Sequence, residues 1–231
     1  MITVETIRER HSVREYDGKP LSRAEFDALG AVVEECARES GLNIQLVGDN
    51  PEVFNVIARF GLIRGCRTHV AFVVDDAKAC GVVDDEAIGY WGQKIVLAAQ
   101  DMGLNTCWCA LCSRKKSRAV VAPGKKIRLI IAVGHGKTQG FSRKTKSVET
   151  LSSVECAKAP AWFAAAMEAA QLAPTAMNNQ NFKITLLSDG KTVRIDAPQS
   201  GLNVIDEGIV RCNFEIAANE AGADWRWERD I

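Results

Sequence analysis

The sequence predicts an α+β protein, because segments with helical spacing of apolar residues alternate with short strands rich in β-branched residues. After Ser22, apolar side chains recur at helical spacing, and serine is a residue type that caps helix N-termini. Residues 69–74, with the sequence His-Val-Ala-Phe-Val-Val, are typical of a largely buried strand. The chain of 231 residues, 47% of them hydrophobic, can bury a full core.

The elements of the first half follow from local signals. Residues 2–10 are expected to form a short helix, and Ser22 begins a second helix. Acidic residues at 84–86 begin a long helix that ends at Gly103, since acidic side chains complement the helix dipole at its start and glycine ends helices. Strands are predicted at residues 43–47, 69–74, 106–109 and 127–133, with an amphipathic segment around Phe54, Ile57 and Phe60 and a loop from Gly134 to Ser147.

The second half repeats this order of elements in shorter form. Pro160, a helix over 162–172 and a strand at 184–186 parallel Pro20, a helix and a strand at 44–46. The sequence Asp-Glu-Ala-Ile at 85–88 reappears as Asp-Glu-Gly-Ile at 206–209. Such an order of elements also recurs by chance in α+β proteins. We expect two pseudo-repeated halves, residues 1–150 and 151–231, that together form one compact unit.

The charges of the chain balance, with 29 Lys and Arg against 29 Asp and Glu. No global field therefore attracts nucleic acid or an anionic membrane, and any anionic ligand must be bound by a local group of donors. The early Glu5 argues against a secretory signal. The apolar stretch at residues 129–133 has strand length and is too short to span a bilayer, so we expect a soluble, cytoplasmic protein.

The eight cysteines are expected to be reduced thiols, because the chain is large enough to fold without disulfides and no export signal is evident. Cys107, Cys109 and Cys112 leave a second interpretation open, since three thiolates at short spacing can bind zinc or an iron–sulfur cluster. Against a metal site, Cys107 and Cys109 share one strand face and no second paired motif supplies a fourth ligand.

The segment Arg10-His11-Ser12-Val13-Arg14 is a candidate phosphate site. It follows a short helix in a non-helical stretch, so its two guanidiniums and its hydroxyl can converge on one anion. Arginine offers forked, permanently charged donors, and serine adds a compact hydrogen bond. Paired arginines are, however, common on solvated surfaces.

Three further segments are candidates for ligand contacts. Pro174 ends an apolar helix, and the amide-rich turn after it can present Asn178 to the edge of a planar heterocycle. Residues 103–109, Gly-Leu-Asn-Thr-Cys-Trp-Cys, form a turn into a strand that carries Trp108. The long loop holds a basic cluster at residues 143–146, Arg-Lys-Thr-Lys.

Taken together and in this order, the four segments resemble the nitroreductase-like family of flavoenzymes. In that family an Arg-x-Ser-x-Arg motif, a Pro-Ser/Thr-x-x-Asn-x-Gln turn, a Gly-Leu-Gly-Thr-Cys-Trp strand entry and a late Arg-Lys pair border flavin mononucleotide (FMN). The resemblance implies an α+β fold in which helices flank a mixed sheet. It assigns to FMN binding Arg10, His11, Ser12, Arg14, Trp108, Ala110, Leu111, Arg143, Lys144, Pro174, Thr175 and Asn178.

The resemblance also implies which part of FMN each group of residues would contact. The arginine motif, with Arg143 and Lys144, would hold the phosphate, the ribityl chain and the pyrimidine side. Trp108 and the backbone of Ala110 and Leu111 would border the ring near N5, where the family commonly has a glycine pair. The proline turn, which in the family comes early in the chain, would close over the ring from the second half. This fused arrangement predicts one FMN per chain and makes a monomer sufficient, while a homo-oligomer stays possible.

The function that the resemblance implies is an FMN-dependent oxidoreductase that passes electrons from NAD(P)H to a planar acceptor such as a nitroaromatic or a quinone. The flavin supplies the chemistry, so no catalytic side chain is assigned. A flavin-binding protein without turnover, acting as a sensor or in storage, is the alternative from another class, and a thiolate metal protein is a third.

Overall fold

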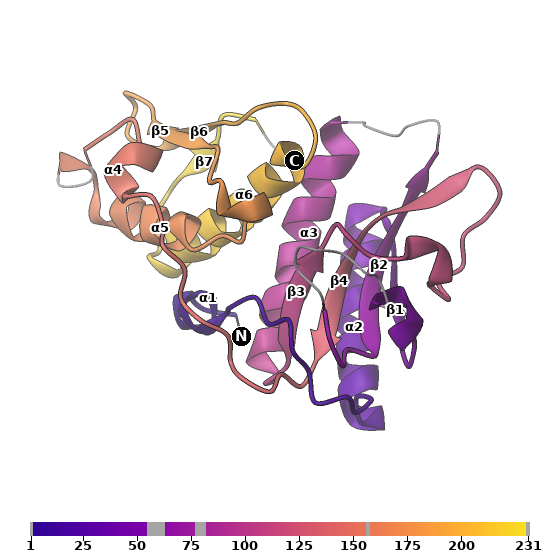
Figure 1. Ribbon diagram of the computed structural model, residues 1–231. Helices are drawn as coiled ribbons and strands as arrows, with labels where there is room; N and C mark the ends of the chain where they lie inside the picture. Colours follow the sequence, from indigo (N-terminus) through magenta and orange to yellow (C-terminus); the bar gives the residue numbers. More distant parts are fainter. Residues whose placement is uncertain (1, 55–62, 77–81, 156–157, 230–231) are drawn as a thin grey trace. The chain divides into compact units, whose positions relative to one another are not determined.

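The computed structural model describes residues 2–54, 63–76, 82–155 and 158–229 (Figure 1). The chain divides into two compact units, each assembled from separate stretches of sequence. Unit 1 comprises Met1–Glu9, Cys80–Gln93 and Arg143–Ile231, and unit 2 comprises Arg10–Ala79 and Lys94–Ser142.

Unit 2 is built on a four-stranded antiparallel sheet in the order β1-β2-β4-β3. Its helix α2 (Arg23–Ser40) packs against β1 and begins with a complete capping box, in which Ser22 and Glu25 each bond the other's backbone. Gly41, in the left-handed conformation, ends this helix. The strands are β1 (Asn43–Val47), β2 (Thr68–Asp75), β3 (Asn105–Cys109) and β4 (Lys125–Gly134), and a short 3-10 helix spans Pro51–Phe54.

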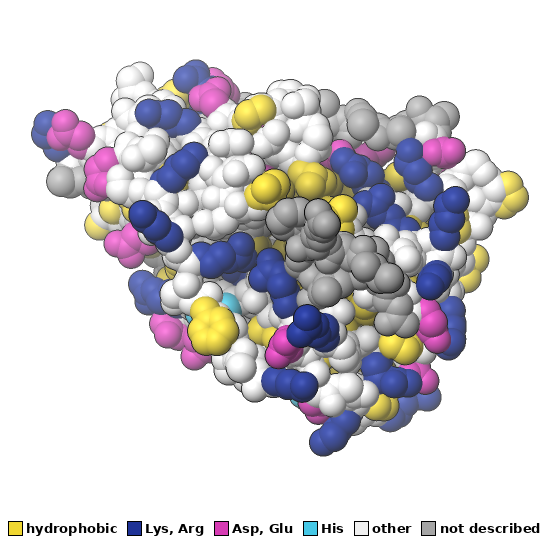
Figure 2. Space-filling model, viewed as in Figure 1, with side chains coloured by type: hydrophobic (Ala, Val, Ile, Leu, Met, Phe, Trp, Pro, Cys, Tyr) yellow, Lys and Arg dark blue, Asp and Glu magenta, His cyan; other side chains and the backbone are white. Residues whose placement is uncertain are grey.

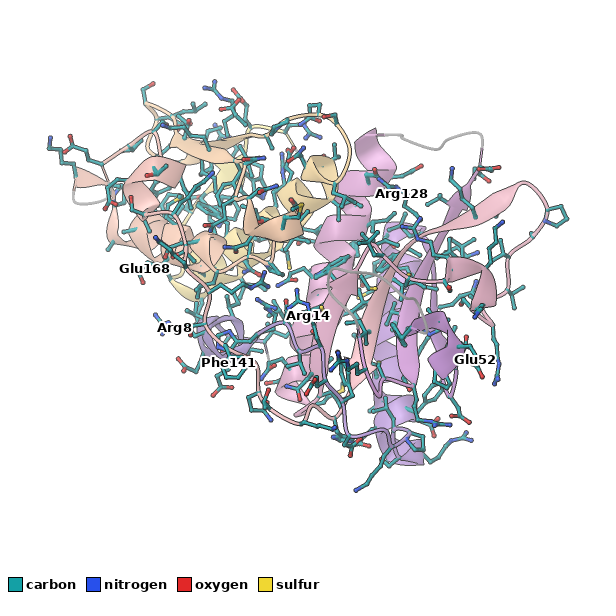
Figure 3. The ribbon with its side chains drawn as sticks, in the orientation of Figure 1. Arg8, Arg14, Glu52, Arg128, Phe141 and Glu168 are labelled. Carbon is teal, nitrogen blue, oxygen red and sulfur yellow. The ribbon has the colours of Figure 1, made fainter. Side chains whose placement is uncertain are left out.

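Unit 1 combines helices with a small sheet in the order β5-β6-β7, whose last pair is parallel. Helices α5 and α6 pack together through a group of aromatic rings that includes Phe163, Phe214 and Trp227. Arg8 of α1 and Glu168 of α5 form an exposed ion pair at 3.9 Å (Figure 3). The elements are α1 (Val4–Glu9), α4 (Val148–Leu151), α5 (Ala161–Gln171), α6 (Asn203–Glu220), β5 (Lys183–Leu186), β6 (Thr192–Asp196) and β7 (Arg226–Trp227).

Helix α3 (Val82–Asp101) begins in unit 1, where it crosses α6 at very close range. A Cβ added to Gly89 would lie 2.0 Å from the carbonyl oxygen of Ile205, and one added to Gly208 would lie 2.0 Å from that of Glu86. Glycine at both positions lets the two backbones touch, because any side chain there would force the helices apart. The crossing therefore depends on both residues.

The α+β class predicted from the sequence is confirmed, and the helices and strands predicted within the described residues are present with small shifts at their ends. The large sheet is antiparallel throughout, and parallel pairing occurs in the small sheet. The amphipathic segment around Phe54, Ile57 and Phe60 lies mostly outside the described residues. The internal repeat and the halves 1–150 and 151–231 stay predictions.

The surface carries charges of both signs. Figure 2 shows Lys and Arg side chains interspersed with Asp and Glu on the face in view, as the equal totals of 29 lead one to expect. Within the described residues, no helix has the length and apolar character needed to cross a membrane.

Candidate functional site

The arginine motif of unit 2 is held in an extended conformation beside the sheet. Ser12 forms a parallel bridge with Thr106 at the start of β3, and the backbone N–H of Val13 donates to the Thr106 carbonyl at 3.0 Å. Further along, Tyr16 pairs with Gly136 just after β4. Two of the four predicted segments, the arginine motif and the strand entry that leads to Trp108, are thus neighbours in this unit.

The side chains of this motif differ in burial. Arg10 is buried, with 6% of its surface exposed, whereas Arg14 is exposed, and His11 and Ser12 are half-buried. Figure 3 labels Arg14 on the same unit as the large sheet. A guanidinium as buried as that of Arg10 is costly unless neighbouring groups compensate its charge, so the motif combines one fixed cation with one that solvent reaches.

Asn105 organises the loop next to this motif. Its side-chain oxygen accepts a hydrogen bond from the Gly136 backbone at 2.9 Å, and its amide donates to Gln139 at 2.8 Å. Gly140 completes the contact, since a Cβ there would lie 2.6 Å from that of His11. Asn105, which stands where the family has the second glycine of Gly-Leu-Gly, thus holds the loop against the arginine motif.

Trp108, Ala110 and Leu111 lie at the end of β3 and just beyond it. The Trp108 ring stacks on Phe72 with a centroid distance of 6.2 Å and an interplanar angle of 13°. Ala110 and Leu111 line a pocket of about 630 Å³, and Leu111 is 63% exposed. The same pocket is lined by Cys112, Ser113, Arg114, Lys115 and Lys116, so its wall is strongly basic.

The proline turn of unit 1 adopts a conformation that L-residues rarely take. Met177, Asn178 and Gln180 have φ angles of 52°, 58° and 47° in the left-handed region. Asn tolerates this region better than most residues, but Met and Gln do not. Strain of this kind persists only where neighbouring groups determine the backbone, and it is concentrated at functional sites.

Two groups fix the start of this turn. The buried Thr175 hydroxyl accepts a hydrogen bond from the Gln180 backbone at 3.0 Å and so closes the turn. The Ala176 backbone donates to both carboxylate oxygens of Asp206 on α6, at 2.9 and 3.0 Å. Burial raises the pKa of Asp206 to about 7, while the bond from Ala176 acts in the opposite direction.

The basic loop binds to the other side of the turn. The Asn178 amide donates to the Lys144 carbonyl at 2.7 Å, and the Lys146 ammonium donates to the Gln180 carbonyl at 2.9 Å. The Gln180 side chain accepts from the Lys146 backbone at 2.7 Å. The remaining pair of predicted segments, the turn with Pro174 and the loop with Arg143 and Lys144, are therefore bonded to each other in unit 1.

A buried ion cluster, consisting of Glu86, Glu207, Arg211 and Arg229, lies where α3 crosses α6. Arg211 approaches Glu86 at 2.9 Å, and the side chains of Glu86, Glu207 and Arg211 are at most 3% exposed. Arg229 contacts Glu86 at 2.8 Å and Glu207 at 3.2 Å. The two arginines balance the two carboxylates, as burial in a medium of low dielectric constant demands.

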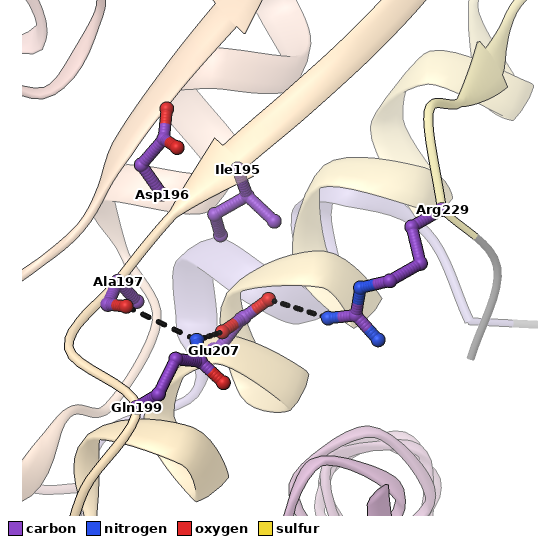
Figure 4. A pocket seen from close by; sticks show the side chains of 6 residues that line it. All are labelled: Ile195, Asp196, Ala197, Gln199, Glu207 and Arg229. Carbon is purple, nitrogen blue, oxygen red and sulfur yellow. Dashed lines mark hydrogen bonds and ion pairs between the residues drawn. The ribbon is translucent and has the colours of Figure 1, made fainter. Parts of the chain in front are cut away.

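A pocket of about 440 Å³ opens beside this cluster (Figure 4). In it the Gln199 amide donates to Glu207 at 2.8 Å and to the Ala197 carbonyl at 3.0 Å. Burial raises the pKa of Glu207, and the bond from Gln199 offsets part of that effect. Gln199, Glu207 and Arg229 in this pocket are thus linked to one another.

Sequence reasoning missed several residues that build these sites. Gln180, Lys146 and Asn105 lie inside the segments identified from the sequence but received no role there, and Asp206 lies outside them, because the hydrogen bonds that define their roles are set by the fold. For Asp206 and Glu86 the repeated Asp-Glu pair was the available signal, which we interpreted as a repeat. Among the described residues, no group of three or more His, Cys, Asp or Glu side chains is placed to hold a metal ion.

Comparison with known proteins identifies the family. The family described as "Putative TM nitroreductase" matches residues 2–218. A solved structure described as a "putative nitroreductase" from Thermotoga maritima is 20% identical, with a TM-score of 0.67 over 100% of this chain and 90% of its own. One from Desulfovibrio desulfuricans, a "putative nitroreductase in complex with FMN", is 20% identical, with a TM-score of 0.51 over 66% of this chain and 95% of its own. No curated protein matches. The chain has the nitroreductase fold and belongs to the family that matches residues 2–218.

Proposed function

We propose that this protein is an FMN-dependent oxidoreductase that passes electrons from NAD(P)H to a planar acceptor such as a nitroaromatic or a quinone. The observation that supports it most is the pairing of the four motif segments. The arginine motif is bonded to the strand entry in unit 2, and the proline turn is bonded to the basic loop in unit 1. A similarly folded structure from Desulfovibrio desulfuricans contains FMN.

The residues present fit a phosphate monoester and a flat heterocycle. The phosphate requires charged, forked donors, which Arg10 and Arg14 offer from one extended segment. Arg143 and Lys144 are exposed on the loop that binds the turn. We propose that both groups of cations bind one FMN per chain, with Ser12 and His11 beside the arginines.

For the ring, we propose contacts from Trp108, Ala110 and Leu111 on one side and from Pro174, Thr175 and Asn178 on the other. FMN, when bound, supplies the two-electron chemistry between donor and acceptor. The role of this chain is to bind the cofactor and orient it. Arg10 and Arg14 would place positive charge beside the bound group, and the hydrogen bond from its amide to the Lys144 carbonyl would hold the Asn178 side chain in place.

Turnover separates this function from flavin storage. Purified protein loaded with FMN should oxidise NADH or NADPH steadily when a quinone or a nitroaromatic compound is supplied. Protein that retains FMN but turns over neither donor with either acceptor class would contradict the oxidoreductase and leave a flavin-binding protein without turnover. Protein that binds no FMN would contradict both.

A further inference from the structure

Two cysteines at the end of β3 form a close pair in the sequence Cys109-Ala110-Leu111-Cys112. The Cys109 thiol donates to the Leu111 carbonyl at 3.4 Å, and the Cys112 thiol donates to the Cys109 carbonyl at 3.7 Å. Both side chains therefore turn back onto the same short bend. A spacing of three residues across a bend allows two sulfur atoms to bond.

The two thiols differ in access. Cys109 is 5% exposed, whereas Cys112 is half-buried and lines the basic pocket with Leu111 and Arg114. A reagent in the pocket reaches the sulfur of Cys112 first. Cys109 is nearly closed to solvent and does not line the pocket, so it is suited to react only with its neighbour.

Arg114 places a cation at this pair. Its guanidinium donates to the Ala110 carbonyl at 2.8 Å, so it is fixed over the bend between the cysteines. A hydrogen bond with the Cys109 thiol and the positive charge of Arg114 both lower the pKa of Cys112. The same hydrogen bond, together with burial, raises the pKa of Cys109. By contrast, burial raises the pKa of Cys36 to about 11 and that of Cys66 to about 12.

We propose that Cys109 and Cys112 are a redox-active dithiol that exchanges with low-molecular-weight disulfides, with Cys112 as the attacking sulfur and Cys109 as the resolving one. The Cys112 thiolate attacks one sulfur of the disulfide, forms a mixed disulfide and releases one thiolate. Cys109 then loses its proton, attacks the sulfur of Cys112 and releases the second thiolate. The chain loses two electrons and two protons, and the small disulfide becomes two thiols.

Thiol exchange at this pair needs no FMN, although Ala110 and Leu111 between the cysteines are also proposed ring contacts, so each proposal can fail without the other. Mixtures of reduced and oxidised glutathione at graded ratios would be equilibrated with the full chain, which is then quenched, alkylated and digested with trypsin. Cleavage after Lys94 and Arg114 gives one peptide, residues 95–114, that carries Cys107, Cys109 and Cys112. In oxidising mixtures it should lose two hydrogens and bear an alkyl group on Cys107 alone.

Two sets of variants locate the reaction. Cys107→Ser should still form the internal disulfide, whereas Cys109→Ser should stop at glutathione attached to Cys112. Arg114→Gln should slow alkylation of Cys112 near neutral pH by roughly three- to tenfold, while Lys116→Gln, which removes a charge from the same pocket, should slow it less. Three alkylated cysteines at every ratio in the unaltered chain, a disulfide that uses Cys107, or a stable mixed disulfide beside an intact Cys109 would each overturn the proposal.

Discussion

The backbone N–H of Ala176 donates hydrogen bonds to both carboxylate oxygens of Asp206, at 2.9 and 3.0 Å. Ala176 belongs to the turn that carries Asn178, and Asp206 belongs to the first turn of α6. This contact joins the turn to α6, most of whose residues are buried. It also places an ionisable group, with its pKa raised to about 7, under the proposed ring contacts.

Asp206 should make the stability of the chain depend on pH. Its pKa rises from 3.8 to about 7 on burial, so the native state keeps a proton that the unfolded state releases between those values. The free energy of unfolding should therefore fall as pH rises through this window and level off above it, by about 4 kcal/mol at most. Asp206→Asn, whose amide oxygen still accepts from Ala176, should lose this slope in urea unfolding. Parallel pH profiles for the two proteins would contradict the buried, protonated carboxyl.

Asn178 should stabilise the turn in two ways, because asparagine tolerates a left-handed φ and its side-chain amide donates a hydrogen bond. Alanine disfavours the left-handed φ of 58° at this position, and Asn178→Ala also removes the hydrogen bond to the Lys144 carbonyl. The variant should therefore lower the free energy of unfolding, measured with a chemical denaturant, by about 2 kcal/mol. Asn178→Gly loses the bond but accepts the backbone angle, so it should cost about half as much. Equal losses for both variants would show that the turn is not strained at this residue.

Gly208 should tolerate no side chain. Its added Cβ would lie 2.0 Å from the Glu86 carbonyl oxygen, so Gly208→Ala must separate α3 from α6 and should lower the free energy of unfolding by about 3 kcal/mol or more. Gly30 in α2 is the matched control, because the nearest atom to its added Cβ is the Leu46 side chain at 3.9 Å. Gly30→Ala should be neutral or stabilising by up to about 1 kcal/mol. A mild effect at Gly208 would mean that the helices do not touch there.

Arg211 should be the essential cation of the buried ion cluster. Arg211→Met leaves Glu86 and Glu207 buried with one partner that is 53% exposed, which should cost about 3–5 kcal/mol. Arg229→Met removes that exposed partner and should cost less, because solvent screens its charge. Adding Glu86→Gln to Arg211→Met should restore part of the loss in thermal unfolding. No recovery in the double variant would contradict a charge-based explanation.

Much of the fold could be predicted from local signals. The capping box at Ser22 and the apolar run of β2 fix their elements within a few residues, so α2 and the large sheet were predictable. The two-residue strand β7 was not, because Arg226–Trp227 is too short for any period, and β6 was missed although apolar and polar residues alternate over Thr192–Asp196. Their positions depend on tertiary pairing.

The candidate site was predictable in part. Motif resemblance identified the four segments, since each keeps its residue types in sequence. It could not identify Asp206, whose role arises from burial and from one backbone bond thirty residues away. Spacing alone also could not decide whether Cys107, Cys109 and Cys112 bind a metal or whether two of them form a thiol pair. The answer depends on which sulfur atoms face the same bend.

The FMN content of the purified chain tests the central proposal most directly. The protein should be yellow, hold one FMN per chain and gain thermal stability when FMN is added. Arg10→Ala combined with Arg14→Ala should abolish retention, whereas Arg8→Ala, which removes an exposed cation paired with Glu5 and Glu168, should not. A colourless protein whose unfolding temperature does not respond to FMN, or unchanged affinity in the double variant, would contradict the proposed site.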